Sequence, residues 1–178
     1  MSAALQVVVV GSVPKTLLKE LAQPIAGTFH LASVSGPSLT DPKYALNPPR
    51  KQYHSTAIIR RLVSQLAPDQ AGILGVCDVD LFTPEAEFVY GEADREEHAA
   101  LISLARLKVG ASPEVLIRRA QAEAVHEVGH LLGLSHCDDL RCAMFLSRSP
   151  ADSDRKGTAL CNDCRHELQR LAKGAAPV

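Results

Sequence analysis

The chain has 178 residues, of which 46% are hydrophobic and 22% are charged. Because domains usually contain about 100–200 residues, we expect a single domain over residues 1–178. The 19 basic and 20 acidic residues give a net charge of −1, so neither nucleic acid nor an anionic membrane is an expected partner. The apolar run at residues 5–10 is too short for a membrane span and lacks the basic start of a secretion signal.

Four of the five cysteines lie in the last third of the chain. Cys161 and Cys164 form a CxxC pair, and Cys137 and Cys142 have four residues between them. An odd number of cysteines without a secretion signal predicts a reducing, cytoplasmic environment with free thiols. Grouped thiolates at these spacings favour a closed, structural zinc site. A redox CxxC or unrelated buried thiols are the alternatives. Cys77 lies in an apolar run and is expected in the core.

The first half of the chain alternates strand and helix patterns. We expect strands at 6–10, 29–34 and 71–78, helices at 14–22 and 53–66, and a Gly- and Pro-containing loop at 35–50. This βαβαβ order predicts a largely parallel sheet with right-handed crossovers.

Two shorter strands are expected next, at 87–90, which ends at Gly91, and at 99–107. For the segment 99–107 a helix is the alternative, because the charged residues 95–97 just before it could equally begin one. The late position of 87–90 in the series indicates an edge strand. The alternative is an interior strand that is paired on both sides.

A long helix is predicted from Pro113 to Leu132. Ser112 suits its N-cap, Pro113 its first position, and Gly133 its C-terminal end. A final helix is expected at 163–173. These limits divide the domain into a sheet-containing part, an active-site helix with its following turn, and a cysteine-rich C-terminal part, at 1–111, 112–136 and 137–178.

The long helix contains the sequence His126-Glu127-Val128-Gly129-His130. Two histidines four residues apart lie about 40° apart around a helix, so both imidazoles can bind one metal ion. The carboxylate of Glu127 can then act as a general base on water. Gly133 permits the chain to turn back and bring His136 to the same ion, which gives an open, catalytic coordination shell. The alternative is that these are surface residues of an amphipathic helix. The remaining histidines have no partner at a ligand spacing. We expect them to be surface or hydrogen-bonded histidines that bind no metal: His30, His54, His98 and His166.

The order HExxHxxGxxH, Cys, four residues, Cys, one residue, Met and a distal CxxC resembles the archaemetzincin family of metzincin-clan zinc peptidases. The stretches 50–53, 73–78 and 103–107 also resemble that family, so the likeness covers most of the chain. One departure is the segment of sixteen residues between Met144 and Cys161, about one shorter than usual. It affects a loop and no ligand.

The resemblance implies a role for each matching residue. His126, His130 and His136 would bind a catalytic zinc, Glu127 would do acid–base work, and Met144 would form the Met-turn below the metal. Cys137, Cys142, Cys161 and Cys164 would bind a second, structural zinc. Because His136 and Cys137 are consecutive, the thiolate site would also fix the third histidine. Asp138 and Asp139 could be hydrogen-bond partners of a ligand imidazole, although solvated loop carboxylates are the favoured interpretation.

We therefore expect an α/β, compact single-domain metzincin-like fold. Its twisted, mixed and mostly parallel sheet would have an antiparallel edge strand and be backed by helices, including a long active-site helix. The expected function is zinc-dependent hydrolysis of peptide bonds by a monomer that binds two zinc ions and a peptide or protein substrate. In metzincin-like folds the antiparallel edge faces the cleft, so substrate would bind as an added strand beside Glu87, Phe88, Val89 and Tyr90. A zinc-stabilised peptide-binding module with little turnover, or a hydrolase of a non-peptide amide, would share these residues.

Overall fold

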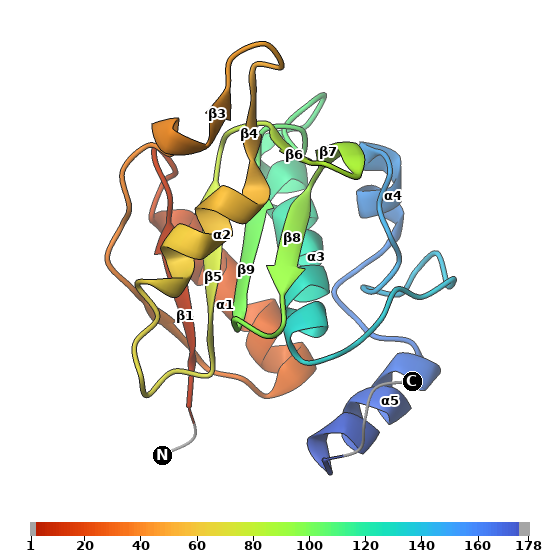
Figure 1. The fold of residues 1–178 in the computed structure, drawn as a ribbon. Helices are drawn as coiled ribbons and strands as arrows, with labels where there is room; N and C mark the ends of the chain where they lie inside the picture. The colour runs from red at the N-terminus through yellow and green to blue at the C-terminus, as the bar shows by residue number, and fades with distance from the viewer. Residues whose placement is uncertain (1–2, 175–178) are drawn as a thin grey trace.

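The computed structural model describes residues 3–174 and contains two β-sheets (Figure 1). The larger sheet has the strand order β2-β1-β5-β9-β8. Neighbouring strands are parallel except that β8 runs antiparallel to β9. The predicted sheet, mostly parallel with an antiparallel edge strand, is therefore confirmed. Its strands are β1 (Leu5–Val9), β2 (Ser33–Ser35), β5 (Gly72–Cys77), β8 (Gly91–Asp94) and β9 (Ala99–Ser103).

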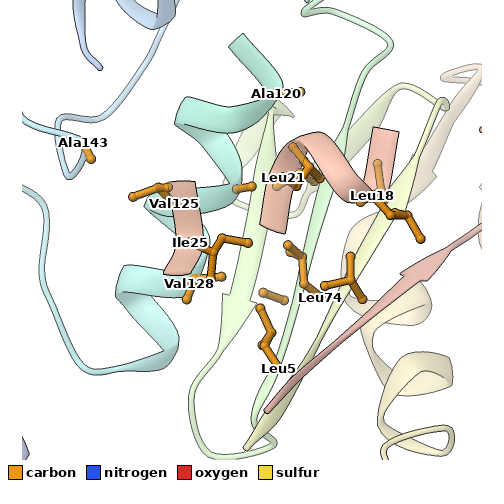
Figure 2. Close-up of a cluster of buried hydrophobic side chains, with 14 of the residues drawn as sticks. Leu5, Leu18, Leu21, Ile25, Leu74, Ala120, Val125, Val128 and Ala143 are labelled. Atoms are coloured by element: carbon orange, nitrogen blue, oxygen red, sulfur yellow. The ribbon is translucent and has the colours of Figure 1, made fainter. Parts of the chain in front are cut away.

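Helices cover both faces of this sheet. Two of them, α1 and α3, lie on one face, and α2 lies on the other (Figure 1). Figure 2 shows Leu21 and Ile25 of α1 beside Val125 and Val128 of α3 in the larger core. Because both faces are covered, the central strands are buried throughout and have nearly continuous apolar sequences. The helices are α1 (Thr16–Phe29), α2 (Ser55–Val63), α3 (Pro113–Leu131), α4 (Pro150–Arg155) and α5 (Asn162–Ala172).

A second, smaller sheet has the order β3-β4-β6-β7 and lies at the top of Figure 1. Its strands are β3 (Leu46–Asn47), β4 (Gln52–His54), β6 (Leu81–Thr83) and β7 (Ala86–Val89), preceded by a 3-10 helix, η1 (Lys43–Ala45). The strand predicted at 87–90 corresponds to β7, which is an edge strand as expected, although of this second sheet. The antiparallel edge of the main sheet is the next strand, β8.

The first helix is longer than predicted. Instead of ending at residue 22, α1 passes through Pro24 to Phe29, where His30 adopts a left-handed conformation with φ 54°. Proline has no N–H to donate to the carbonyl four residues earlier. Here the Gln121 side chain of α3 donates a hydrogen bond of 2.8 Å to that carbonyl, on Glu20. The strand predicted at 29–34 is consequently displaced to β2, at Ser33–Ser35.

Other boundaries also differ from the predictions. The helix predicted at 53–66 begins at Ser55, because residues 52–54 form β4 and pair with β6. The strand predicted at 99–107 ends at Ser103. The loop predicted at 35–50 contains η1 and β3, and α4 was not predicted. No helix within residues 3–174 is long and apolar enough to cross a membrane.

Candidate active site

The long helix α3 carries the predicted metal-binding histidines. Its start follows the prediction, since the Ser112 hydroxyl accepts a hydrogen bond of 3.3 Å from the Val115 amide. At the other end, Gly133 adopts φ 99°, a left-handed conformation that favours glycine. The chain reverses there, and the Leu134 amide donates to the Gly129 carbonyl at 2.9 Å. This turn brings His136 back to the two histidines of the helix.

The imidazoles of His126 and His130 are held by main-chain carbonyl groups. The distance from His126 Nδ1 to the Ala143 oxygen is 2.8 Å, and that from His130 Nδ1 to the Leu134 oxygen is also 2.8 Å. A carbonyl oxygen can only accept, so each Nδ1 carries the proton and each neutral ring has its lone pair on Nε2. The two Nε2 atoms then face each other at 3.1 Å.

The three histidines fit a shared metal ion. Two lone pairs that face each other repel unless a cation lies between them. Nitrogens bound at about 2.0–2.1 Å to one tetrahedral ion are separated by about 3.3 Å, close to the observed spacing of the Nε2 atoms. His136 completes the group, with one nitrogen of each ring within 4.8 Å of the others. His136 is exposed, so the site is open to solvent on that side.

All three imidazoles are neutral near pH 7. Burial lowers the pKa of His130 to about 4. Burial and the positive charge of Lys156 lower the pKa of His126 well below its usual range, and the same two causes lower the pKa of His136. Metal binding requires the neutral imidazole. The site is therefore in the protonation state that a metal ion needs.

Glu127, the predicted general base, is buried beside β8. Its side chain lies against Gly91, where a β-carbon would come within 2.7 Å of Glu127 Oε1. Burial raises the pKa of Glu127 well above the usual carboxyl range, with a further increase from Glu123. Glu92 acts in the same direction, and the positive charge of Lys156 acts in the opposite one. A carboxyl group with a raised pKa is suited to both accepting and returning a proton near neutral pH.

A tight turn at residues 142–145, which we call the Met-turn, lies below the histidines. The Phe145 amide donates to the Cys142 carbonyl at 3.0 Å and closes the turn. Its two central residues face α3. Ala143 supplies the carbonyl for His126, and the fully buried Met144 packs against Gly129. Met144 therefore lies against the segment of α3 that carries His126 and His130, and its role beneath a bound metal stays a prediction.

The four clustered cysteines converge on one point. Their Sγ atoms all lie within 4.8 Å of one another, and those of Cys137 and Cys161 are 3.7 Å apart. Two sulfurs at about 2.3 Å from a tetrahedral zinc are separated by about 3.8 Å. Backbone amides also point at the sulfurs, including that of Cys161, which donates to Cys142 Sγ at 3.3 Å. The donor set and its spacing therefore fit a zinc ion.

Cys77 is separate from this cluster and lies in the core, as predicted. Its side chain is 0% exposed, and burial raises the pKa of its thiol to about 11. A thiol with such a pKa is unreactive.

The two loop aspartates take no part in holding the imidazoles. Asp138 and Asp139 are exposed, and the carboxylate of Asp139 accepts from the Arg141 amide at 2.9 Å. The favoured interpretation of these residues as loop carboxylates is therefore confirmed.

Residues 88–90 line a cavity of about 270 Å³ together with Gly91 and Glu123. Leu146 and Arg148 also line this cavity. Two of the main-chain carbonyls in the predicted substrate segment already have partners. Glu87 accepts from Gln52 Nε2 at 2.9 Å, and Tyr90 accepts from the Ser103 amide at 2.8 Å.

Sequence reasoning missed a buried charged pair next to this cavity. Lys156 Nζ lies 3.1 Å from Glu123 Oε1, and both side chains are almost fully buried. The sequence did offer one signal for this pair. Glu123 lies one turn before Glu127 and among the alanines at positions 120, 122 and 124, a pattern that indicates a buried carboxylate. No pattern in the polar segment around Lys156 indicates that its ammonium group is buried.

The fold and the three converging imidazoles define a metal-dependent peptidase of the metzincin type. The sequence profile of peptidase family M54 matches residues 43–170. The chain belongs to this family, the archaemetzincins, and is a zinc metallopeptidase.

Several known proteins are similar to this chain in sequence or structure over nearly its full length. Archaemetzincin of Methanocaldococcus jannaschii is 39% identical over 165 residues, covering 90% of this chain and 89% of that protein. The archaemetzincin of Thermococcus kodakarensis is 33% identical and covers 92% and 94%, respectively. The crystal structure of Methanopyrus kandleri archaemetzincin superimposes with a TM-score of 0.85 at 29% identity, with 97% of each chain covered. A zinc-dependent peptidase from Methanocorpusculum labreanum gives 0.83 at 27% identity, covering 93% of this chain and 100% of that one.

Proposed function

We propose that this zinc metallopeptidase uses Glu127 as the general base in peptide-bond hydrolysis and binds two zinc ions per chain. The main support is the site's donor chemistry. The Nε2 lone pairs of His126 and His130 face each other at 3.1 Å. Glu127, whose side chain is buried, follows His126 directly in the helix. Binding alone would not require a carboxylate there, whereas hydrolysis requires a base.

The residues divide the work of hydrolysis. A zinc ion held by His126, His130 and His136 would polarise the scissile carbonyl and lower the pKa of water. Glu127 would take a proton from the attacking water and later deliver it to the leaving amine nitrogen. Burial raises the pKa of Glu127 above the usual carboxyl range, which makes the carboxylate a stronger base for the first transfer.

The second zinc, held by Cys137, Cys142, Cys161 and Cys164, has a structural role in this proposal. Four sulfurs complete a tetrahedral shell and leave no position for substrate. Two of these ligands adjoin the catalytic site. Cys137 follows His136 in the chain, and Cys142 begins the Met-turn, so the closed site would hold both in place.

Substrate binding is proposed at the strand edge beside the cavity. Residues 87–90 would contact the substrate, with Phe88, Val89 and Tyr90 forming the cavity wall. The adjoining edge strand β8 offers main-chain groups for pairing. Because Tyr90 bonds to Ser103 of β9, the antiparallel alternation turns the polar groups of Gly91 and Ala93 toward the free edge. An extended peptide could add there as a further strand.

Turnover of a broad peptide library, with metal content measured on the same preparation, tests the function. We expect cleavage by the wild type and none by E127Q, with two zinc ions retained in both. Peptide binding without cleavage in the wild type would favour the binding module. Cleavage confined to non-peptide amides would favour the other alternative.

A crystal structure with a zinc-chelating peptide hydroxamate tests the substrate edge. The proposal predicts ladder hydrogen bonds from the peptide to Gly91 or Ala93 and contacts with residues 88–90. A chelated ligand that makes neither would exclude this binding mode while leaving the peptidase activity unaffected.

A further inference from the structure

A buried network of charged and polar side chains joins α3 to the segment after the Met-turn. Lys156 is 0% exposed and Glu123 is 3% exposed at the side chain. Besides the ammonium group of Lys156, Glu123 Oε1 accepts from the hydroxyls of Ser147 and Ser153, each at 2.8 Å. One carboxylate oxygen therefore collects three donors from the segment 147–156, one turn before Glu127 on the same helix.

Lys156 makes a second contact, and this one reaches the Met-turn. Its Nζ donates to the Phe145 carbonyl at 3.0 Å. Phe145 is the last residue of the turn, and its amide closes the turn onto Cys142. Lys156 therefore joins one end of the Met-turn to the carboxylate of Glu123 on the active-site helix.

The other end of the Met-turn is held by the cysteine cluster. Cys142 Sγ lies among the four sulfurs and accepts from the Cys161 amide. The turn is thus anchored at both ends, by a thiolate at its first residue and by an ammonium group at its last. Between these anchors lies the Ala143 carbonyl, which holds Nδ1 of His126 at 2.8 Å.

A buried ion pair contributes little net stability to a fold. Removing two charges from water costs several kcal/mol per ion, and replacing such a pair with apolar residues of similar volume is often neutral or stabilising. The notable property of this pair is instead its contact with a main-chain carbonyl of the Met-turn. Hydrogen-bond partners of ligand imidazoles orient the ligand, and their loss typically weakens metal binding 10- to 100-fold.

We propose that Lys156 is a positioning residue of the catalytic metal site: with its charge balanced by Glu123, it fixes the Phe145 end of the Met-turn and so the carbonyl that orients His126. The inference rests on the proposed binding of metal by the three histidines. It assigns Lys156 no contact with substrate and no proton transfer.

The E123Q/K156M double variant provides the test. The glutamine that replaces Glu123 still offers an oxygen to Ser147 and Ser153, and methionine fills the volume of lysine, so no unpaired charge remains buried. The Phe145 carbonyl loses its donor. This design removes the positioning contact while avoiding the folding failure that K156M alone could suffer.

Co²⁺ titration of the histidine site is the main measurement, made on protein whose thiolate site holds zinc. We expect the double variant to melt near the wild-type temperature but to bind Co²⁺ at the histidine site 10- to 100-fold more weakly. Its kcat should fall when the site is saturated with metal, because His126 is misoriented, while KM changes little. Zinc at the thiolate site should be retained.

R119M/D154N is a matched control. Arg119 and Asp154 join α3 to α4 by a two-bond ion pair, with N–O distances of 2.7 and 2.8 Å. The other hydrogen bonds of Arg119 go to the carbonyls of Leu107 and Val109, which lie outside the Met-turn. This variant should lower the melting temperature and leave the Co²⁺ affinity unchanged.

Wild-type Co²⁺ affinity and wild-type kcat in E123Q/K156M would overturn the inference. Equal weakening of Co²⁺ binding in the control would also overturn it, since the effect would then be one of general stability. If the wild type itself bound no metal at the histidines, the proposed function would fail, which is a distinguishable result.

Discussion

Gly129 of the active-site helix and Met144 of the Met-turn are in direct contact, and a β-carbon on Gly129 would overlap Met144 Sδ. The glycine lies between the two helical histidines in sequence. Its lack of a side chain therefore determines how closely the Met-turn approaches the helix below the metal site.

The variant G129A tests this contact. We expect a loss of about 1–3 kcal/mol in the free energy of unfolding, because overpacking displaces Met144, together with weaker metal binding at the histidines. Urea denaturation and metal titration would measure the two effects. G27A is the control, since a β-carbon on Gly27 in α1 meets nothing within 4 Å. It should stabilise the protein by about 0.5–1 kcal/mol. Equal stabilisation of both variants would contradict the packing argument.

The contact between Gly91 and Glu127 gives a second prediction. In G91A the new β-carbon would lie 2.7 Å from Glu127 Oε1 and 2.6 Å from the Leu101 carbonyl. Both groups must shift, so kcat should fall at least about tenfold while both metals remain bound. Steady-state kinetics with metal analysis would show this. G157A, where the nearest atom is 3.9 Å from the added carbon, should retain full activity. Unchanged kcat in G91A would argue against the placement of Glu127 as the base.

The thiolate site should carry much of the stability. Structural zinc contributes on the order of 10 kcal/mol to folding, compared with about 5–15 kcal/mol for a whole domain. We therefore expect C164S to lower the melting temperature sharply or to abolish soluble expression. C77A removes a thiol outside the cluster and should retain the zinc of that site, with only a modest loss of core packing. Equal melting temperatures for C164S and the wild type would refute the structural role.

Metal-free protein should lose stability as the pH falls from about 6.5 to 4. Burial lowers the pKa of His130 in the folded state to about 4, whereas an unfolded histidine titrates near 6.5. Between these values the unfolded chain binds a proton that the folded chain does not, so lowering the pH favours unfolding. The raised pKa of Glu127 acts in the opposite direction. The comparison of wild type with H130N isolates the histidine.

Urea midpoints at pH 7, 6 and 5 on chelator-treated protein provide the measurement. The wild type should lose stability relative to H130N over this range. Parallel pH profiles for the two proteins would show that the protonation of His130 is not linked to folding.

The active-site helix and the convergence of the three histidines and of the four cysteines could be predicted because their signals are local. Helix periodicity places His126 and His130 on one face, and Gly133 marks the turn that returns His136. The cysteine spacings likewise reveal a cluster without knowledge of the fold. The geometry of both groups follows these short-range patterns.

Features that depend on distant contacts could not be predicted. β8 has the sequence Gly-Glu-Ala-Asp, which has low strand propensity, and it is a strand because it pairs with β9. In α1, which continues through Pro24, the Glu20 carbonyl accepts a hydrogen bond from Gln121, which lies far away in sequence. The buried state of Lys156 depends on its pairing with Glu123 across two separate segments.

The carbonyl partners of His126 and His130 have a consequence for mutagenesis. Where a carboxylate side chain orients a metal-binding histidine, one substitution can remove that partner and alter the charge of the site. Here the acceptors are the main-chain oxygens of Ala143 and Leu134, which every amino acid possesses. Single substitutions at positions 143 and 134 would therefore leave both acceptor oxygens in place. With both histidines retained, the contribution of these acceptors could be altered by moving the backbone or by replacing a peptide bond with an ester.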